Sequence, residues 1–325
     1  MAGEVERFES LAAVEAAAAG ALDRRPLLFE RLAWFRLIAA HCPPPGRFLG
    51  LRSGDTWLFL AIQGRRARAY SAWYSLRVGL IGGTNGAESI ATSLRKQLTY
   101  LALSPVDDAN ALAGALRRTG WLVHVSPATA SWRSDVAGKS FEAWWAERPA
   151  RLRSTAARKG RTAGLAITIH RAFDAAAWAA YEEVYRASWK PEEGSFAFLR
   201  ALAEEEGAAG RLRLGIASKD GRAVAAQLWT IEDGTAWIHK LAYREDTKAL
   251  SPGTVLSEAM FRAAIDEDRV ARIDYGTGDE PYKSDWMDRC ETLWRVEAWK
   301  PRSLAGLAGA ARAAASRLVR RYGSG

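Results

Sequence analysis

The 325 residues are enough for about two domains, and 49% apolar with 26% charged side chains is typical of a soluble globular protein. Only two cysteines are present, Cys42 and Cys290, and neither has a cysteine or histidine partner nearby, which excludes a disulfide framework and a zinc site. The net charge of +9 is local, because the segments 151–171 and 300–325 each hold six basic residues and no acidic residue. This distribution favours anion contacts at two places over a uniformly basic surface that coats nucleic acid.

The sequence contains no readable secretory signal or membrane-spanning segment. The N-terminus is acidic and lacks a basic start followed by an apolar run, and charges interrupt every long apolar stretch. We therefore expect a cytoplasmic chain in a reducing compartment, with any membrane contact made as a peripheral protein at the inner face.

The first half predicts a mixture of helices and strands. Residues 8–40 are rich in alanine and leucine and indicate helix up to the breaker at 43–46. The elements expected after it are strands at 48–51, 56–62 and 67–80, a helical or mixed stretch at 89–103, a helix at 107–119, a strand at 121–125 and a helix at 141–161.

The second half repeats that order. A strand is expected at 165–170, helices at 174–189 and 196–206, and three strands at 212–218, 223–231 and 235–243. Asp-Gly pairs at 220–221 and 233–234 predict tight hairpins between these strands. A helix at 252–266, with Ser251 as N-cap and Pro252 in its first turn, and strands at 271–275 and 293–300 complete a mixed α+β fold.

The start of the helix at 252 is a candidate anion site. The amides of Gly253, Thr254 and Val255 are expected to point outward, and the missing side chain of Gly253 lets a bulky anion come close. A pyrophosphate can be held in this way. Most capped helices bind no ligand, so a purely structural cap is the alternative.

A dense group of polar residues follows the strand at 271–275. A Gly-x-Gly turn leads to Asp279, Glu280, Tyr282 and Lys283 within five positions. Glycines permit a ligand to approach the backbone, and all four side chains can hold or move protons. This density favours a functional site over a loop that only caps the next helix.

The run at 274–286 resembles the G-[DE]-x-x-Y-K-x-x-W signature of the CelD-like branch of the GNAT acyltransferases, which is related to the FemAB transferases. The arginine-rich segment 148–161, the Ser-Trp-Lys element at 188–190 and the strand end at 240–243 are similar to the same branch. The resemblance covers roughly residues 100–300. It implies a GNAT fold, in which a twisted, mostly antiparallel sheet is flanked by helices and its fourth and fifth strands splay apart to admit an acyl thioester.

The resemblance and the repeated order together imply a tandem of two GNAT-like halves. We expect a degenerate N-terminal half at 1–140, a basic helical connector at 141–164, a catalytic half at 165–300 and a basic amphipathic tail at 301–325. The tail has arginines opposite an apolar stripe, which suits an anionic membrane surface. Docking of the tail on its own domain is the alternative.

The co-substrate that the resemblance implies is acyl-CoA, with no metal. The pantetheine would lie along the strand at 235–243 and the phosphates at the following helix start, which assigns the contacts to Leu241, Tyr243, Ser251, Gly253, Thr254 and Val255. Pro252 removes one amide donor from that helix start. An acyl-carrier protein or an aminoacyl-tRNA is therefore an alternative donor.

Amide formation needs a base for the amine and an acid for the departing thiolate. His239 is one candidate base, and the two-residue period of a strand is expected to place it on the face of Trp237, Leu241 and Tyr243. A packed strand histidine is the alternative reading. Asp279 and Glu280 are competing bases, and Tyr282 is the expected acid.

The acceptor is expected beside the end of the helix at 174–189 and the strand at 271–275. The residues assigned to it are Tyr185, Trp189, Lys190, Trp237, Tyr275, Lys283 and Trp286. An aromatic plane beside polar groups suits a sugar ring, and clustered tryptophans suit a lipid chain equally well. Lys283 would pair with Asp279 or meet an anionic group of the acceptor.

These features predict an N-acyltransferase that moves an acyl group to the amine of a cell-envelope component. The acceptor would be an amino sugar of an exopolysaccharide or a long-chain sphingoid-type amine that becomes a ceramide. One alternative is an aminoacyl-tRNA-dependent FemAB-type transferase, in which the basic segment 151–161 follows the RNA backbone. The other is a non-catalytic glycan-binding module with tryptophans as sugar platforms.

Overall fold

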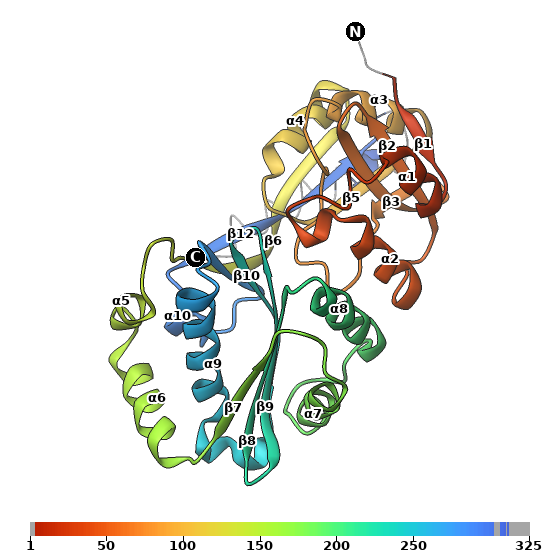
Figure 1. Cartoon of the computed structure of the whole chain (residues 1–325). Helices are drawn as coiled ribbons and strands as arrows, with labels where there is room; N and C mark the ends of the chain where they lie inside the picture. The colour runs from red at the N-terminus through yellow and green to blue at the C-terminus, as the bar shows by residue number, and fades with distance from the viewer. Residues whose placement is uncertain (1–3, 302–305, 310, 312–325) are drawn as a thin grey trace. The chain divides into compact units, whose positions relative to one another are not determined.

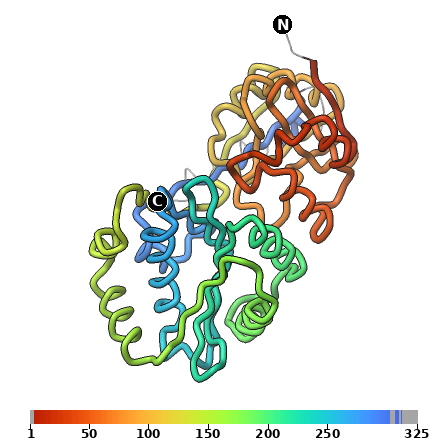
Figure 2. Tube along the Cα trace, viewed as in Figure 1, coloured from red at the N-terminus to blue at the C-terminus, as the bar shows by residue number. Residues whose placement is uncertain are grey.

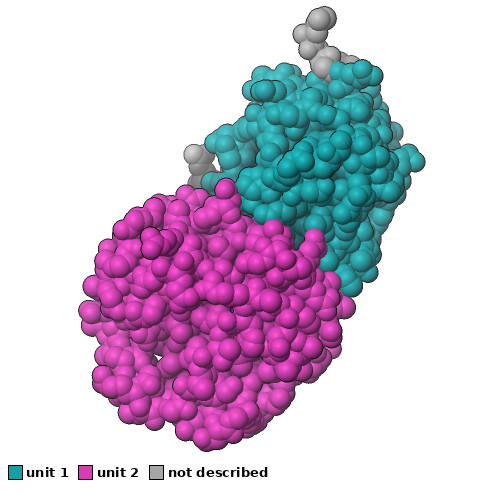
Figure 3. Space-filling model, viewed as in Figure 1, with its two compact units in different colours: residues 1–129, 292–325 teal, residues 130–291 magenta. Residues whose placement is uncertain are grey.

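The computed structural model describes residues 4–301, 306–309 and 311 of the chain (Figure 1). These residues form two compact units, unit 1 with residues 1–129 and 292–325 and unit 2 with residues 130–291 (Figure 3). No helix in the described part of the chain is long and apolar enough to cross a membrane. The amphipathic tail expected at 301–325 lies almost wholly outside the described residues.

Unit 1 is built on a mixed sheet with the strand order β1-β2-β3-β4-β5-β12. Neighbouring strands are antiparallel except for the parallel pair β4 and β5. The elements are β1 (Glu6–Phe8), α1 (Leu11–Ala18), η1 (Leu28–Glu30), α2 (Leu32–His41), β2 (Arg47–Ser53), β3 (Thr56–Gln63), β4 (Arg66–Ala69), α3 (Ala87–Gln97), β5 (Tyr100–Val106), α4 (Ala109–Arg118), the first part of β6 (Leu122–Asp135) and the last part of β12 (Arg289–Trp299).

Unit 2 is built on strands in the order β6-β11-β10-β9-β8-β7, with one parallel pair, β10 and β11. Helices α7 and α8 contact one face, and α9, backed by α6, contacts the other (Figure 1). The elements are α5 (Phe141–Ala146), α6 (Ala150–Thr162), β7 (Ala166–His170), α7 (Ala175–Arg186), α8 (Phe196–Ala208), β8 (Leu212–Lys219), β9 (Arg222–Glu232), β10 (Thr235–Tyr243), η2 (Glu245–Leu250), α9 (Pro252–Arg262), η3 (Ala263–Glu267), β11 (Arg272–Thr277) and α10 (Lys283–Trp286).

From β7 onward the chain repeats the element order that runs from β1 to β6, which confirms the predicted tandem. The two repeats exchange their last strands. The end of β6 lies in unit 2 and pairs with β11, and the end of β12 lies in unit 1 and pairs with β5 (Figure 2). The compact units therefore end within β6 and β12. The assignment of transfer chemistry to 165–300 concerns function and stays a prediction.

Local sequence explains most of the element boundaries. The hairpin turns form where Asp-Gly pairs predicted them, and the φ angles of Asp233 and Gly234 are 43° and 68°, as a type I′ turn requires. The helix expected at 141–161 is divided into α5 and α6 at Pro149, which has no amide hydrogen to donate. The helix expected at 8–40 is interrupted after α1, where Ala19 takes a left-handed conformation.

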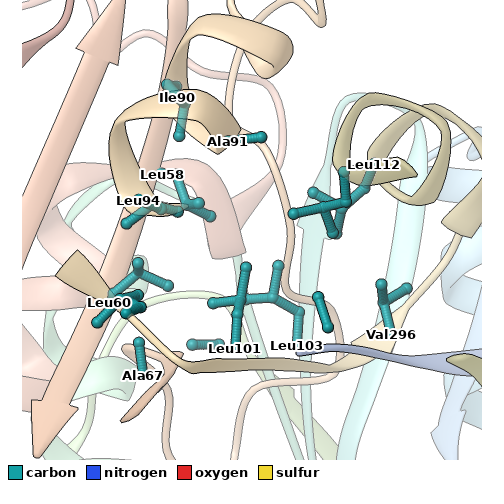
Figure 4. Close-up of a cluster of buried hydrophobic side chains, with 14 of the residues drawn as sticks. Leu58, Leu60, Ala67, Ile90, Ala91, Leu94, Leu101, Leu103, Leu112 and Val296 are labelled. Carbon is teal, nitrogen blue, oxygen red and sulfur yellow. The ribbon is translucent and has the colours of Figure 1, made fainter. Parts of the chain in front are cut away.

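Each unit has its own apolar core. In unit 1, Ile90 and Leu94 of α3 pack over Leu60 of β3 and Leu101 of β5, and Val296 of β12 joins the same cluster (Figure 4). The exchanged strand therefore contributes to the core of unit 1 as well as to the sheet. Burial of such aliphatic side chains contributes about 1.5–3 kcal/mol each relative to exposure.

The core of unit 2 is mainly aromatic. The rings of Trp144 and Trp286 lie face to face with Phe261 of α9, at centroid distances of 4.8 and 5.0 Å, and Trp229 of β9 meets the same ring edge-on at 5.1 Å. Most tryptophans of this unit therefore fill the core. Trp189 is different, with 45% of its surface exposed. Helix α9 approaches β8 closely because residue 215 is a glycine, whose Cβ would lie 2.5 Å from the sulfur of Met260.

Candidate active site

Strands β10 and β11 diverge along their length. The backbone pairing joins Thr235–Trp237 to Arg272–Asp274 and does not continue beyond these residues, although both strands are fully described. A cavity of about 430 Å³ lies between the diverging strands, the first turns of α9, and α6. A space of this size is in the range of small-molecule sites.

The lining of this cavity unites residues that the sequence assigned to the donor and to the acceptor. The predicted residues in the lining are Trp189, Leu241, Tyr243, Ser251, Gly253, Thr254, Tyr275, Tyr282 and Trp286. The sequence reasoning missed Arg151, Leu152, Thr155, Lys248, Ser257 and Asp285. A signal existed for Ser257, because it follows Gly253 by one helical turn and so lies on the same side of α9.

The first turn of α9 departs from the expected arrangement. Ser251 adopts a left-handed conformation with a φ of 52°, and its side chain makes no capping hydrogen bond. The amides of Thr254 and Val255 donate to the Ser251 carbonyl at 3.1 and 3.2 Å. The expectation that they point outward as free donors is therefore wrong, and Val255 does not line the cavity. A Cβ at Gly253 would lie 3.1 Å from the Tyr243 ring, so glycine permits the close packing of α9 on β10.

A β-bulge changes the side-chain alternation of β10. Ile238 pairs with Trp229 and Lys240 pairs with Leu228, so that His239 is the extra residue on its strand. An extra residue reverses which side chains share a face on either side of it. A sequence of residue types does not reveal where such a register shift occurs.

The bulge separates His239 from the cavity. Leu241 and Tyr243 line the cavity, but the His239 Nε2 atom lies 2.9 Å from the hydroxyl of Thr230, whose residue pairs with Trp237. The prediction of one common face for His239, Trp237, Leu241 and Tyr243 is therefore wrong. His239 and Trp237 lie on the opposite face from the two cavity residues.

Residues 147–284 match the family model described as an acetyltransferase (GNAT) domain. The matched segment contains the diverging strands, α9 and most of the cavity lining. The protein has a GNAT fold.

Three solved structures share this fold at low sequence identity. The C-terminal domain of a protein named as a lysylphosphatidylglycerol synthetase from Agrobacterium fabrum is 14% identical, with a TM-score of 0.62 over 95% of this chain and 97% of that chain. FemX is 9% identical, with a TM-score of 0.61 over 90% of this chain and 96% of that chain. A tandem GNAT protein from the clavulanic acid biosynthesis pathway is 14% identical, with a TM-score of 0.51 over 92% and 100%. No curated protein matches the sequence.

His239 lies on the face of the GNAT sheet opposite the cavity, and it is a weak base. Burial of the ring and the charge of Lys240 lower its pKa to about 3, so the imidazole is neutral near pH 7. Its contact, the Thr230 hydroxyl, also donates to Glu232 at 3.0 Å. These properties fit a packed strand histidine better than a general base for an ammonium group.

The face of the sheet that carries His239 also carries a buried polar cluster near the end of α7. Lys240 forms an ion pair with Glu193 at 2.8 Å, and burial together with the charge of the same carboxylate raises the pKa of Tyr185. Lys190 adjoins this cluster, and its pKa is lowered by burial and by the charges of Lys240 and Lys283. Tyr185 and Lys190 therefore lie in a charged region next to the cavity and not in its lining.

The loop between β11 and α10 is held together by Lys283. Its ammonium group is buried, donates to the carbonyls of Thr277 and Gly278 at 2.8 and 3.3 Å, and pairs with Glu280 at 2.8 Å. Burial alone would raise the pKa of Glu280, but the hydrogen bond and charge of Lys283 outweigh it and lower that pKa. Asp279 accepts from the indole of Trp132 at 3.1 Å. Neither carboxylate lines the cavity.

Of the three tyrosines in the cavity lining, Tyr275 and Tyr282 have raised pKa values. The rings of Tyr275 and Tyr282 meet edge-on with centroids 6.0 Å apart. Burial raises the pKa of both phenols, with the charge of Glu280 adding to the shift at Tyr282. Both groups can therefore donate a hydrogen bond near pH 7. Among the described residues, no cluster of His, Cys, Asp and Glu is suited to hold a metal ion.

Proposed function

We propose that the cavity of unit 2 binds an acyl donor and that the protein transfers the acyl group from acyl-CoA to an amine. The observation that carries this proposal is the divergence of β10 and β11, which opens a cavity of about 430 Å³ beside two protonated tyrosines. Beyond Trp237 the pairing of β10 with β11 has ended, which leaves room for an extended pantetheine along Leu241 and Tyr243.

The cationic residues of the lining suit the phosphates of CoA. Arg151 of α6 and Lys248 of η2 both line the cavity beside Gly253. Lys159 donates to the carbonyl of Ala249 at 2.5 Å and so ties α6 to η2. Because two amides of α9 are already used, we assign the phosphate contacts mainly to the Arg151 and Lys248 side chains.

The proposed reaction forms a bond between the amine nitrogen and the acyl carbon and breaks the carbon–sulfur bond of the thioester. Tyr282 gives its proton to the departing thiolate and regains a proton from the nitrogen as the amide forms. Asp285 is an acidic residue of the cavity lining, and we assign it the proton of the attacking ammonium in preference to Asp279, Glu280 and His239.

We place the acceptor at the open side of the cavity. Trp189 and Tyr282 are 45% and 39% exposed there, and the Trp189 ring lies 4.3 Å from the ring of Tyr243. Aromatic faces of this kind suit a sugar or an alkyl chain. With the CelD-like run at 274–286, they support an amine of a cell-envelope component, either an amino sugar or a sphingoid-type amine.

A second candidate is transfer from an aminoacyl-tRNA. The observation that favours it is the exposure of Arg151, Arg158 and Arg161 along α6, which continues the basic character beyond the cavity. A row of exposed cations fits a nucleic-acid backbone better than a single pair of phosphates.

Substitutions on α6 distinguish the two donors. Arg151 lines the cavity and Arg158 does not, so Arg151→Gln and Arg158→Gln form a matched pair on one helix. If CoA is the donor, calorimetry should show CoA affinity falling about 10- to 150-fold in Arg151→Gln and unchanged in Arg158→Gln, since one charge-assisted contact contributes about 1.5–3 kcal/mol.

The tRNA alternative predicts a different result. Both substitutions should then weaken tRNA binding and reduce its salt dependence. Release of free thiol from acyl-CoA in the presence of an amine measures the reaction itself. The absence of both CoA binding and thiol release would overturn the first proposal.

A further inference from the structure

Unit 1 contains a cavity with an apolar interior. Its volume is about 240 Å³, and buried aromatic rings contribute to its lining. Phe29 meets Trp34 edge-on, with ring centroids 5.0 Å apart. Phe35 meets Phe59 in the same way at 4.7 Å, and none of these four side chains is more than 6% exposed. An engineered apolar cavity of about 150 Å³ stays dry and binds benzene or xenon. The cavity of unit 1 therefore suits an apolar ligand larger than benzene.

Segment 70–86 forms one wall of this cavity and is fixed by backbone hydrogen bonds. The Tyr70 amide donates to the Phe59 carbonyl at 2.9 Å. Trp57 and Ile81 exchange two bonds of 2.9 Å. Because Trp57 and Phe59 both belong to β3, the wall is tied to one strand at two places. The cavity is therefore part of the folded unit.

The charged groups of the lining already have partners. Arg77 pairs with Asp107 at 3.1 Å, and Glu30 pairs with Arg25 at 2.7 Å. Asp108 is the N-cap of α4 and accepts a backbone amide at 2.8 Å, where the helix dipole favours a negative charge. A charged ligand would therefore have to bury its charge without a partner, which is costly. An uncharged ligand fits the lining best.

A buried hydroxyl of the lining is suited to a polar group on the ligand. Ser75 is 6% exposed, and its oxygen accepts from the Ala72 amide at 3.2 Å. Its proton has no acceptor among the residues that the structure describes. A hydroxyl proton rotates to suit its partner, so Ser75 can donate to an oxygen of the ligand.

We propose that the cavity of unit 1 binds the aliphatic chain of an uncharged molecule whose head carries an oxygen. The chain lies among the buried rings, and the oxygen of the head accepts from Ser75. This site goes beyond the proposed function and does not rest on it, because all of its lining residues belong to unit 1. Binding alone tests it, without a measurement of turnover.

Three eight-carbon probes that differ only in the head group test the class of ligand. Calorimetry near pH 7 should show binding of octanol, with octanoate and octylamine about tenfold weaker or more, because each of these would bury a charge. Hexanol should bind about 15-fold more weakly than octanol, since each buried methylene changes the affinity about fourfold. Octanoate or octylamine binding as tightly as octanol would overturn the uncharged class. Absence of octanol binding would overturn the site.

A matched pair of leucine substitutions locates the site. Leu80 lines the cavity, whereas Leu122 is an exposed leucine of unit 1 outside that lining. Leu80→Trp should lower octanol affinity about tenfold or more, because the larger ring excludes part of the chain, and Leu122→Trp should change it less than about twofold. Ser75→Ala should lower it about two- to tenfold, as expected for one hydrogen bond. Equal affinities in the two leucine variants would contradict the location, and an unchanged affinity in Ser75→Ala would contradict the head-group contact.

Fluorine NMR tests the location even if Leu80→Trp does not fold. In protein labelled with fluorinated tryptophan, Trp34→Phe and Trp73→Phe identify two resonances. Trp34 lines the cavity, whereas Trp73 lies outside the lining and is 88% exposed. We expect octanol to move the Trp34 resonance and to leave the Trp73 resonance in place. A Trp34 resonance that does not move at saturating octanol would overturn the proposal.

Discussion

The two units share one order of elements but differ where the fourth strand leads to the following helix. In unit 2 the short segment η2 joins β10 to α9, and the first turns of α9 face a cavity. In unit 1 a longer segment, residues 70–86, joins β4 to α3. The Val78 amide of this segment donates to the Pro105 carbonyl at the end of β5 at 2.8 Å. In unit 1, segment 70–86 therefore fills the region that corresponds to the cavity of unit 2.

The start of α3 in unit 1 is closely packed against β2 and β3. The Gly86 amide at the start of α3 donates to the Thr56 hydroxyl at 2.9 Å, and a Cβ at Gly86 would lie 2.3 Å from the Ser53 carbonyl oxygen. A cavity of about 590 Å³ adjoins the first residues of α3, and Glu88 and Arg118 are among the residues that line it. Unit 1 has a separate cavity of about 240 Å³, which its connecting segment helps to line. The connecting segment, more than the order of elements, therefore decides where a GNAT-like sheet can admit a ligand.

The largest expected effect tests whether chemistry belongs to unit 2 alone. Tyr282→Phe keeps the ring and removes the proposed acid, so kcat should fall about 10²–10⁴-fold while acyl-CoA affinity changes little. Tyr70→Phe is the matched control, because Tyr70 lines the cavity of unit 1. Steady-state thiol release measures both. An equal loss in the two variants would break the assignment of the reaction to unit 2.

A second pair of substitutions tests the helix starts. Gly86→Ala places a Cβ against backbone and should destabilise the protein by about 1–3 kcal/mol. Gly253→Ala meets only the Tyr243 ring, at 3.1 Å, and should cost less. Chemical denaturation followed by tryptophan fluorescence compares the two. If Gly253→Ala proved the more destabilising, the helix start of unit 2 would be the tighter one.

The smallest effect concerns His239 of unit 2 and its pH dependence. The folded-state pKa of about 3 lies below the ordinary 6.5, so between these values the unfolded chain binds a proton that the folded chain does not. The free energy of unfolding should therefore decrease as the pH falls from about 6.5, by at most about 1.4 kcal/mol per pH unit. His239→Gln should remove this part of the slope. Calorimetry at pH 6.5 and 5.5 checks it, with an unchanged slope counting against a buried neutral histidine.

The sequence was sufficient for the order of elements and for much of the cavity lining. The Asp-Gly turns and the two-residue and helical periods depend on local chemistry, so β8, β9, β10 and α9 could be placed within a few residues. Tyr243, Gly253 and Tyr282 were found because strand ends, helix starts and polar loops meet at the edge of a GNAT sheet.

Tertiary effects account for what was missed. The bulge at His239 depends on how β10 pairs with β9, and the occupied amides of α9 depend on the left-handed conformation of Ser251. Neither has a signal in residue type. Ser257 lies one helical turn after Gly253, but its hydrogen bond from Gln227 depends on how α9 packs on β9.

The exchange of β6 and β12 also bears on synthesis of the protein. Strand β12 pairs with β5 and contributes Val296 to the core of unit 1, yet in the chain it follows unit 2 and leaves the ribosome after it. Unit 1 therefore cannot complete its sheet until unit 2 has been translated. Until then, one edge of β5 lacks its partner strand. An uncovered edge is a site for wrong strand pairing, so chaperone binding to nascent chains should be strongest in this interval.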